Sequence, residues 1–184
     1  MAKLIVVVDM QKDFIDGALG SAEAVKIVER CAEKITKARD AGDIIVFTRD
    51  THGEDYMQTE EGKNLPVPHC IKGSEGWEIS SKLESLCPGS KILDKETFGS
   101  KALGEYAADL VKEGKIDSAE LFGLCTDICV ISNALLIKAF CPDMPVGVDA
   151  SCSAGVTPQS HDNALLAMES CQIHVTGKGE EPWR

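Results

Sequence analysis

Short aliphatic runs alternate with longer segments of helical period along the whole chain, and this alternation restricts the fold more than any other feature. Residues 4–8 form an unbroken aliphatic run, LIVVV, which is typical of a strand buried on both faces. Residues 21–41 carry apolar side chains at helical spacing, with Ser21 as the expected N-cap and Gly42 as the stop signal. A second aliphatic run follows at residues 44–48. The sequence therefore indicates an α/β protein.

The same alternation continues to the end of the chain. Strands are expected at residues 4–8, 44–48, 91–93, 119–124, 146–148 and 173–176. Helices are expected at residues 21–41, 77–86, 100–112, 127–140 and 158–170. Strands that alternate with helices predict a parallel, doubly wound sheet with a helix layer on each face. No repeat or linker divides the pattern, so a single domain over residues 1–184 is expected.

The charge balance limits the partners of such a protein. The formal net charge is −11, which argues against a nucleic-acid binder or a protein that docks on anionic membrane. No apolar run reaches the roughly 18 residues of a membrane span. The apolar run near the N-terminus is interrupted by Asp9 after five residues, so it does not suit a signal peptide. We expect a cytoplasmic protein.

The chain has eight cysteines but no C-x-x-C motif, so a thioredoxin-type site or a zinc ribbon has little support. Several of the cysteines lie within apolar periodic stretches. We expect buried free thiols for most of them, because a chain of this length needs no disulfide staples. The cysteines are Cys31, Cys70, Cys87, Cys125, Cys129, Cys141, Cys152 and Cys171.

Reactive side chains follow four of the expected strands. Asp9 follows the first, Asp50 and His52 the second, and Lys95 the third, while Cys129 lies in the first helical turn after the fourth. Ligands of open parallel sheets bind at the carboxyl ends of the strands. The joint placement therefore predicts one site at that edge of the sheet.

Cys129 is a candidate nucleophile. With Thr126 as N-cap, Cys129 takes the third helical position, where the positive helix end would stabilise a thiolate. Beside it, Asp9 would carry protons, and Lys95 would hold both groups as anions. A buried structural cysteine is the alternative for Cys129, and it is the expected role of Cys125, which closes the apolar strand.

The polar segment 51–75 is long for a loop, and such loops are usually functional or disordered. Asp50 and His52 lie on one side of an extended segment, and His69 lies across the loop. With waters, these three suit one divalent ion, with zinc as the first choice and iron or manganese as the others. Glu61 is a candidate fourth ligand, although the adjacent Glu60 competes for that role. Two exposed loop histidines are the alternative.

Four motifs together carry a family resemblance. VVVDMQKDF, RDTH followed by PVPHC, DKETF and GLCTDICV resemble the isochorismatase-like cysteine hydrolases, specifically the nicotinamidases. The resemblance runs from the first strand to the sixth. D-x-H with a later histidine separates the nicotinamidases from their relatives. Lys12 stands where an asparagine is common, which puts only local contacts in doubt.

The resemblance implies roles for named residues. It implies a catalytic triad of Asp9, Lys95 and Cys129. It implies metal ligands at Asp50, His52 and His69, with Glu61 as the fourth candidate. It implies a cis peptide between Leu124 and Cys125 and an oxyanion hole of the Cys125 and Cys129 N–H groups. It implies an aromatic pocket lined by Phe14, Trp77 and Phe98. It also implies a six-stranded parallel sheet of order 3-2-1-4-5-6 in a three-layer sandwich.

The implied activity is hydrolysis of nicotinamide to nicotinate and ammonia through a Cys129 thioester. Members of the family often form dimers or larger assemblies, so a homo-oligomer is expected. Two alternatives stay open. One is a hydrolase of a carbamoyl or ureido amide with the same triad and no metal. The other, from a different class, is a metal-binding or redox-sensing module without turnover.

Overall fold

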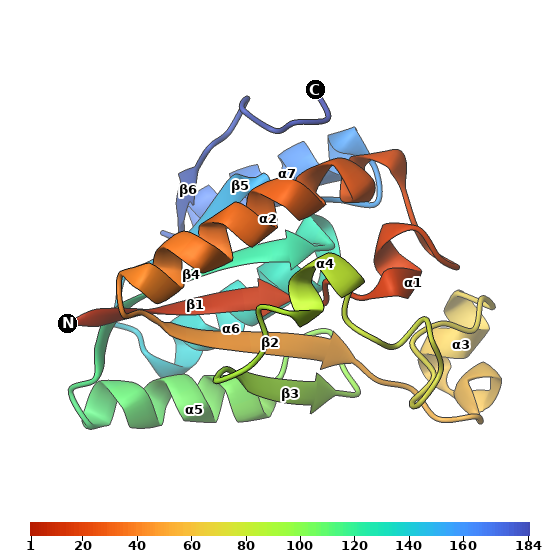
Figure 1. Cartoon of the computed structure of the whole chain (residues 1–184), viewed down its shortest axis with the longest axis horizontal. Coiled ribbons are helices and arrows are strands. Elements are labelled where there is room, and N and C mark those ends of the chain that lie inside the picture. The colour runs from red at the N-terminus through yellow and green to blue at the C-terminus, as the bar shows by residue number, and fades with distance from the viewer.

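The structure is a computed structural model of the whole chain, residues 1–184, and it is built on one six-stranded sheet (Figure 1). The strands are β1 (Ala2–Val8), β2 (Ile44–Asp50), β3 (Lys91–Lys95), β4 (Ile116–Leu124), β5 (Val146–Ala154) and β6 (His174–Thr176). All neighbouring strands are parallel, and their order is β3-β2-β1-β4-β5-β6. The α/β class and the sheet order 3-2-1-4-5-6 are both confirmed.

Helices cover both faces of the sheet. The helical segments are α1 (Lys12–Ile15), α2 (Ala22–Asp40), η1 (Tyr56–Gln58), α3 (Glu60–Asn64), α4 (Ser81–Glu84), α5 (Lys101–Lys112), η2 (Thr126–Val130), α6 (Ile131–Phe140) and α7 (Pro158–Ser170). One core cluster joins the sheet to α1, α2 and α4, and the other joins it to α5, α6 and α7. The three layers are visible in Figure 1.

The aliphatic character of β1 follows from burial on both of its faces. Leu4, Val6 and Val8 lie in one core cluster, and Ile5 and Val7 lie in the other. All five are buried, and burial of an aliphatic side chain contributes about 1.5–3 kcal/mol. The strand therefore has no polar face, and its sequence shows no alternation.

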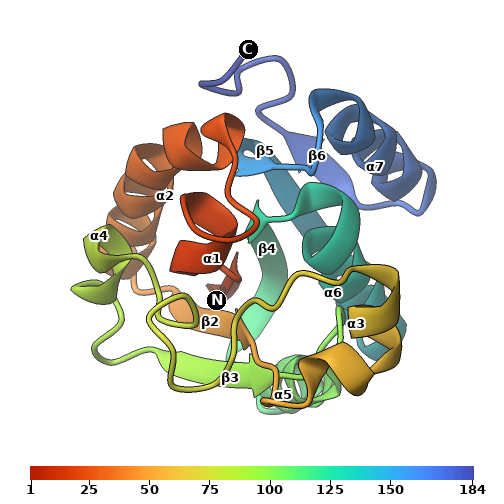
Figure 2. The same cartoon turned by 90° about the vertical axis from the view of Figure 1, so that its right-hand side faces the viewer.

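The strand order brings the carboxyl ends of β1, β2, β3 and β4 to one edge, which faces the viewer in Figure 2. Asp50 pairs with Lys95 in the β2–β3 register, and Val8 pairs with Gly123 in the β1–β4 register. A Cβ on Gly123 would lie 2.2 Å from the Val8 carbonyl oxygen, and its φ is +124°. Only glycine allows β1 and β4 to approach this closely just before the site.

Several expected boundaries are wrong: strand β4 begins at Ile116, before residue 119, and strand β5 continues to Ala154, beyond residue 148. Strand β3 continues to Lys95, whose carbonyl accepts from the Thr51 N–H (2.8 Å), so Lys95 ends the strand rather than following it. The helix expected at 77–86 shrinks to α4, because Ile79 pairs with Gln11 in an extended bridge. The polar segment 51–75, expected to be one long loop, contains the short helical turns η1 and α3.

No helix in the structure combines the length and the apolar character needed to span a bilayer.

Candidate active site

Asp9 follows directly after β1 and is fully buried. Its φ of +47° is unusual for a residue other than glycine. Thr48 of β2 holds it there: the Asp9 N–H donates to the Thr48 carbonyl (3.2 Å), and the Thr48 hydroxyl donates to Asp9 Oδ1 (2.7 Å). Asp9 Oδ2 faces the Lys95 ammonium, which lies 2.7 Å away. The Asp9 carboxylate is therefore held by Thr48 through one oxygen and by Lys95 through the other.

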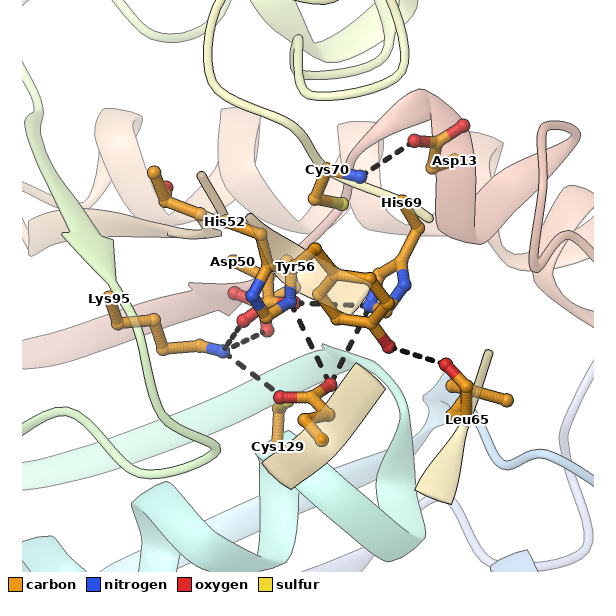
Figure 3. A network of polar contacts seen from close by, with 12 residues as sticks. Asp13, Asp50, His52, Tyr56, Leu65, His69, Cys70, Lys95 and Cys129 are labelled. Carbon is orange, nitrogen blue, oxygen red and sulfur yellow. Dashed lines mark hydrogen bonds and ion pairs between the residues drawn. The ribbon is translucent and has the colours of Figure 1, made fainter. Parts of the chain in front are cut away.

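Lys95 joins the side chains at the sheet edge (Figure 3). Its Nζ lies 2.7 Å from Asp9 Oδ2, 3.0 Å from Asp50 Oδ1 and 3.3 Å from Cys129 Sγ. The Lys95 side chain is only 1% exposed, so these contacts are shielded from water. The structure thus brings together Asp9, Lys95 and Cys129, as the strand-end pattern predicts.

Cys129 lies in η2, a π-helical turn that follows β4. The peptide between Leu124 and Cys125 is cis, as expected. The Cys125 carbonyl accepts from the N–H groups of Ile128 (3.1 Å) and Val130 (3.0 Å). The Cys125 N–H has no acceptor within the protein. A backbone donor beside Cys129 is therefore available to a ligand.

Thr126 is not the N-cap of this turn, which corrects the sequence interpretation. Its hydroxyl lies 2.8 Å from His161 Nδ1 in α7, and the cap position belongs to Cys125, whose side chain makes no capping bond. His161 Nε2 in turn lies 3.2 Å from Glu181 Oε1. A buried chain of hydrogen bonds thus links the turn that carries Cys129 to the C-terminal segment.

Burial shifts the pKa values of all three groups. Burial raises the pKa of Cys129 well above its usual value, the Asp9 carboxylate adds to this, and Lys95 opposes it. Burial thus opposes the thiolate that the helical position of Cys129 favours, and Lys95 supports it. Burial also raises the pKa of Asp9, outweighing the opposite effect of Lys95. Burial lowers the pKa of Lys95, but the charges of Asp9 and Cys129 raise it by more than burial lowers it. The net pKa is therefore above its usual value, which favours the ammonium form.

Four potential metal ligands face one another beside this group. Asp50 Oδ2 lies 2.9 Å from His52 Nε2 and 3.5 Å from His69 Nε2. Glu61 Oε1 lies 3.7 Å from both of these nitrogens. All four ligand atoms lie within 4.8 Å of one another. The Glu61 side chain is 21% exposed and the Glu60 side chain 86%, so only Glu61 turns toward the cluster.

The surroundings orient the cluster for a cation. His69 Nδ1 lies 2.8 Å from the Val67 carbonyl, so a proton held on Nδ1 would let Nε2 give up its hydrogen bond to Asp50 and offer its lone pair to a cation. Burial raises the pKa of Asp50, but hydrogen bonds from His52 and His69 and the charge of Lys95 lower it well below its usual value. Burial and the nearby Asp50 raise the pKa of Glu61. A cation here would relieve this crowding of carboxylates, so the residues fit a divalent ion.

Sequence analysis did not assign three residues that support the cluster. Gln11 accepts from the Asp50 N–H (2.7 Å) and donates to its carbonyl (2.8 Å), which holds the end of β2. Asp13 accepts from the Cys70 N–H (2.8 Å), beside His69. Both belong to the motif DMQKDF, which marked them without showing their partners. The buried Tyr56 ring lies 4.7 Å from the His52 ring, centroid to centroid.

A cleft of about 1670 Å³ opens over both groups and includes Cys125 and Cys129 in its lining. Phe14 and Phe98 line it, as expected from the resemblance. Trp77 does not, which corrects that expectation. Its indole N–H donates to the Thr51 hydroxyl (2.8 Å) while the Arg49 guanidinium covers the ring at 3.7 Å from the centroid. Trp77 therefore braces the end of β2 instead of facing a ligand.

All eight cysteines are free thiols. Cys171 is exposed, Cys87 and Cys125 are partly exposed, and the other five are buried. The expectation of buried free thiols therefore holds for most of them.

The fold and the site define an α/β protein with a cysteine, an aspartate and a lysine at the carboxyl edge of a doubly wound sheet. The model of the isochorismatase domain family matches residues 3–180, so this chain belongs to that family.

Solved structures of several relatives share the fold. The pyrazinamidase/nicotinamidase from Streptococcus mutans UA159 is 28% identical, with a TM-score of 0.82 over 95% of this chain and 100% of that one. The pyrazinamidase of Pyrococcus horikoshii in complex with zinc is 28% identical, with a TM-score of 0.77 over 96% and 99%. N-carbamoylsarcosine amidase from Thermoplasma acidophilum is 26% identical, with a TM-score of 0.77 over 96% of each chain.

Proposed function

We propose that this protein is a metal-dependent cysteine amidohydrolase that converts nicotinamide to nicotinate and ammonia. The observation that carries the proposal is the contact of Lys95 with both Asp9 and Cys129, beside four potential metal ligands. The names of the similar structures support an aromatic amide as the substrate. Phe98 in the cleft wall suits a flat ring.

In the first step, Asp9 acts as the proton acceptor and Cys129 as the nucleophile. Because burial raises the pKa of Asp9, its basicity is closer to what a proton carrier needs at neutral pH. The carboxylate takes the Sγ proton while sulfur forms a bond to the amide carbon. The Lys95 ammonium, 3.3 Å from Sγ, stabilises the negative charge that develops on sulfur.

The carbonyl oxygen gains negative charge as the sulfur attacks. The backbone N–H groups of Cys125 and Cys129 are the proposed donors to this oxyanion. The free N–H of Cys125 supports this role, because a donor that is unpaired beforehand needs no rearrangement. Loss of one such donor costs about 2.7–4 kcal/mol of transition-state stabilisation in related acyl transfer.

Protonated Asp9 then gives its proton to the amide nitrogen as the C–N bond breaks and ammonia leaves. The acyl group remains on Cys129 as a thioester. In the second half, Asp9 takes a proton from water while the water oxygen attacks the thioester carbon. The C–S bond breaks, Asp9 returns the proton to sulfur, and the product leaves as a carboxylic acid that ionises in water.

Asp50, His52, His69 and Glu61 are the proposed ligands of one divalent ion, with zinc as the first candidate. When bound, such an ion supplies a Lewis acid that can anchor a lone-pair donor such as a pyridine nitrogen. Lys95 connects this cluster to the triad, since its ammonium contacts Asp50 as well as Asp9.

The similarity to N-carbamoylsarcosine amidase keeps a second candidate function, hydrolysis of a carbamoyl amide without metal. The four facing ligand atoms favour the metal-dependent amidase, because a metal-free enzyme has no need of them. One experiment separates these functions from each other and from a module without turnover. The protein, stripped and then reloaded with zinc, iron or manganese, is incubated with nicotinamide, pyrazinamide and N-carbamoylsarcosine, and released ammonia is measured.

The proposal expects ammonia from the two aromatic amides only in the metal-loaded protein. Hydrolysis of the carbamoyl amide alone, unchanged by metal removal, would establish the second candidate. Ammonia from none of the three amides under any loading would point to a metal-binding or redox-sensing module.

A further inference from the structure

Asn133 in α6 is a fully buried amide that contacts both walls of the cleft through backbone groups. Its Nδ2 donates to the Cys129 carbonyl (2.8 Å) and to the Phe98 carbonyl (3.1 Å). Its Oδ1 accepts from the Ser100 N–H (2.9 Å). One side chain therefore connects the backbone of Cys129 to residues 98–100, which form part of the cleft wall.

The segment that Asn133 holds lies close against α6. A Cβ on Gly99 would lie 3.3 Å from the Ser132 carbonyl oxygen, closer than most such contacts, so the segment packs tightly against α6 at this point. The Thr97 hydroxyl donates to the Gly99 carbonyl (2.8 Å) and folds the segment back on itself. Ser100 begins α5, where its hydroxyl accepts from the Leu103 N–H. The wall is thus a short bend held between β3 and α5.

Phe98 differs from the residues around it. Its side chain is 46% exposed and lines the cleft, while the adjoining Ser100 is buried. Phe98 cannot be held by core packing to the degree that a buried ring is. The position of its backbone therefore depends on hydrogen bonds, and Asn133 supplies the bond at Phe98 itself and the one two residues later.

We propose that Asn133 is a positioning residue that sets the distance between the Phe98 wall and Cys129, and thereby the selectivity of the cleft for amides that carry a flat ring. The inference rests on the proposed function for the identity of the substrate. The positioning itself concerns only the cleft and its reactive sulfur, so it can be tested without any amide.

The test variant is Asn133→Thr. A threonine hydroxyl in a helix can donate to the carbonyl four residues earlier, so the bond to Cys129 is kept, while Phe98 and Ser100 are out of its reach. The matched control is Asn163→Thr, which makes the same change at an exposed position of α7. Should Asn133→Thr fail to fold, Asn133→Asp keeps the acceptor for Ser100 and removes both donations.

The first readout is alkylation by iodoacetamide and by N-phenyliodoacetamide, followed by peptide mass spectrometry. The ring preference is the labelling rate with N-phenyliodoacetamide divided by the rate with iodoacetamide at Cys129. This ratio is then divided by the same ratio at the exposed Cys171. In Asn133→Thr we expect this preference to fall about tenfold, with the iodoacetamide rate within about twofold of wild type. The second readout is nicotinamide hydrolysis, where we expect KM to rise about tenfold and kcat to stay within about threefold.

A double-mutant cycle with Phe98→Ala distinguishes positioning from a merely structural role. If Asn133 acts through Phe98, Asn133→Thr should change the ring preference little in the Phe98→Ala background. An unchanged ring preference and an unchanged KM in Asn133→Thr, with only a lower Tm, would overturn the proposal. Equal effects in both backgrounds would overturn it as well.

The two proposals fail separately. If wild type releases no ammonia from nicotinamide but loses its ring preference in Asn133→Thr, the positioning role stands and the proposed substrate is wrong. If wild type hydrolyses nicotinamide and Asn133→Thr behaves like Asn163→Thr in every readout, the substrate stands and the positioning role is wrong.

Discussion

Lys95 Nζ lies 3.0 Å from Asp50 Oδ1, so one buried ammonium joins the proposed nucleophilic trio to the proposed metal cluster. Asp50 uses its other oxygen, Oδ2, toward the two histidines. The charge state of each half of the site therefore depends on the other half.

Lys95 should contribute to the stability of the fold, and Lys95→Met tests this contribution. Removal of the ammonium leaves the carboxylates of Asp9 and Asp50 buried without their counter-charge. We expect the metal-free protein to lose about 3–5 kcal/mol of unfolding free energy, measured by urea denaturation at pH 7. The exposed Lys82→Met, which breaks only a surface pair with Glu29, should leave the unfolding free energy nearly unchanged. Equal losses in both variants would contradict the role of Lys95 as a buried counter-ion.

Cys129→Ala should abolish amide turnover, with a loss of at least about 10³-fold in kcat, because it removes the sulfur that forms the proposed thioester. Circular dichroism should stay unchanged. Cys171→Ala is the control, since that thiol is exposed and lies outside the cleft. Retained ammonia release in Cys129→Ala would refute the covalent route.

Glu61 and Glu60 form a matched pair for testing the metal site. Glu61→Gln should weaken zinc binding about tenfold or more, because its carboxylate faces both histidine nitrogens. Glu60→Gln should leave the affinity unchanged, since that side chain is 86% exposed. Titration of the stripped protein with zinc, followed by calorimetry, measures both. Identical affinities in the two variants would remove Glu61 from the ligand set.

His161 should make stability depend on pH. Burial lowers the pKa of His161 in the folded protein, although Glu181 opposes this. Between the folded and unfolded pKa values, His161 is therefore protonated in the unfolded chain and neutral in the folded one. Stability from this group is present above the unfolded pKa of about 6.5 and is lost as pH falls toward the folded value. The slope is at most about 1.4 kcal/mol per pH unit. Asp162 and Arg184 also contribute to the charge around it.

The measurement compares urea unfolding of wild type and His161→Asn between pH 7.5 and about pH 5. The stability difference between them should shrink as pH falls through this window. His174→Asn, at an exposed residue of β6, is the control. A stability difference that does not vary with pH would show that His161 stays equally protonated in both states.

Particular residues show why so much of the site was predictable from the sequence. Asp9, Asp50 and Lys95 come at or just after the ends of aliphatic runs. Parallel strands end at one edge, so a one-dimensional pattern of strand ends becomes a three-dimensional cluster. The order of the strands was not contained in that pattern, and it was expected only from the family resemblance.

Other residues were misassigned because their partners are distant in the chain. Thr126 looked like a helix cap, but it pairs with His161, thirty-five residues later. Trp77 looked like a pocket wall, but it braces Thr51. Asn133 gave no signal at all, because an asparagine inside an apolar helix reveals nothing of the three backbone groups around it.

The sequence by itself determined the α/β class, the strand ends that carry reactive groups and the types of those groups, because periodicity and residue chemistry are local properties. Only the tertiary structure decided how far each reactive group is buried, and therefore in which direction its pKa shifts. Burial depends on every neighbour in space, and it raises the pKa of both Cys129 and Asp9, an effect that local sequence patterns do not contain.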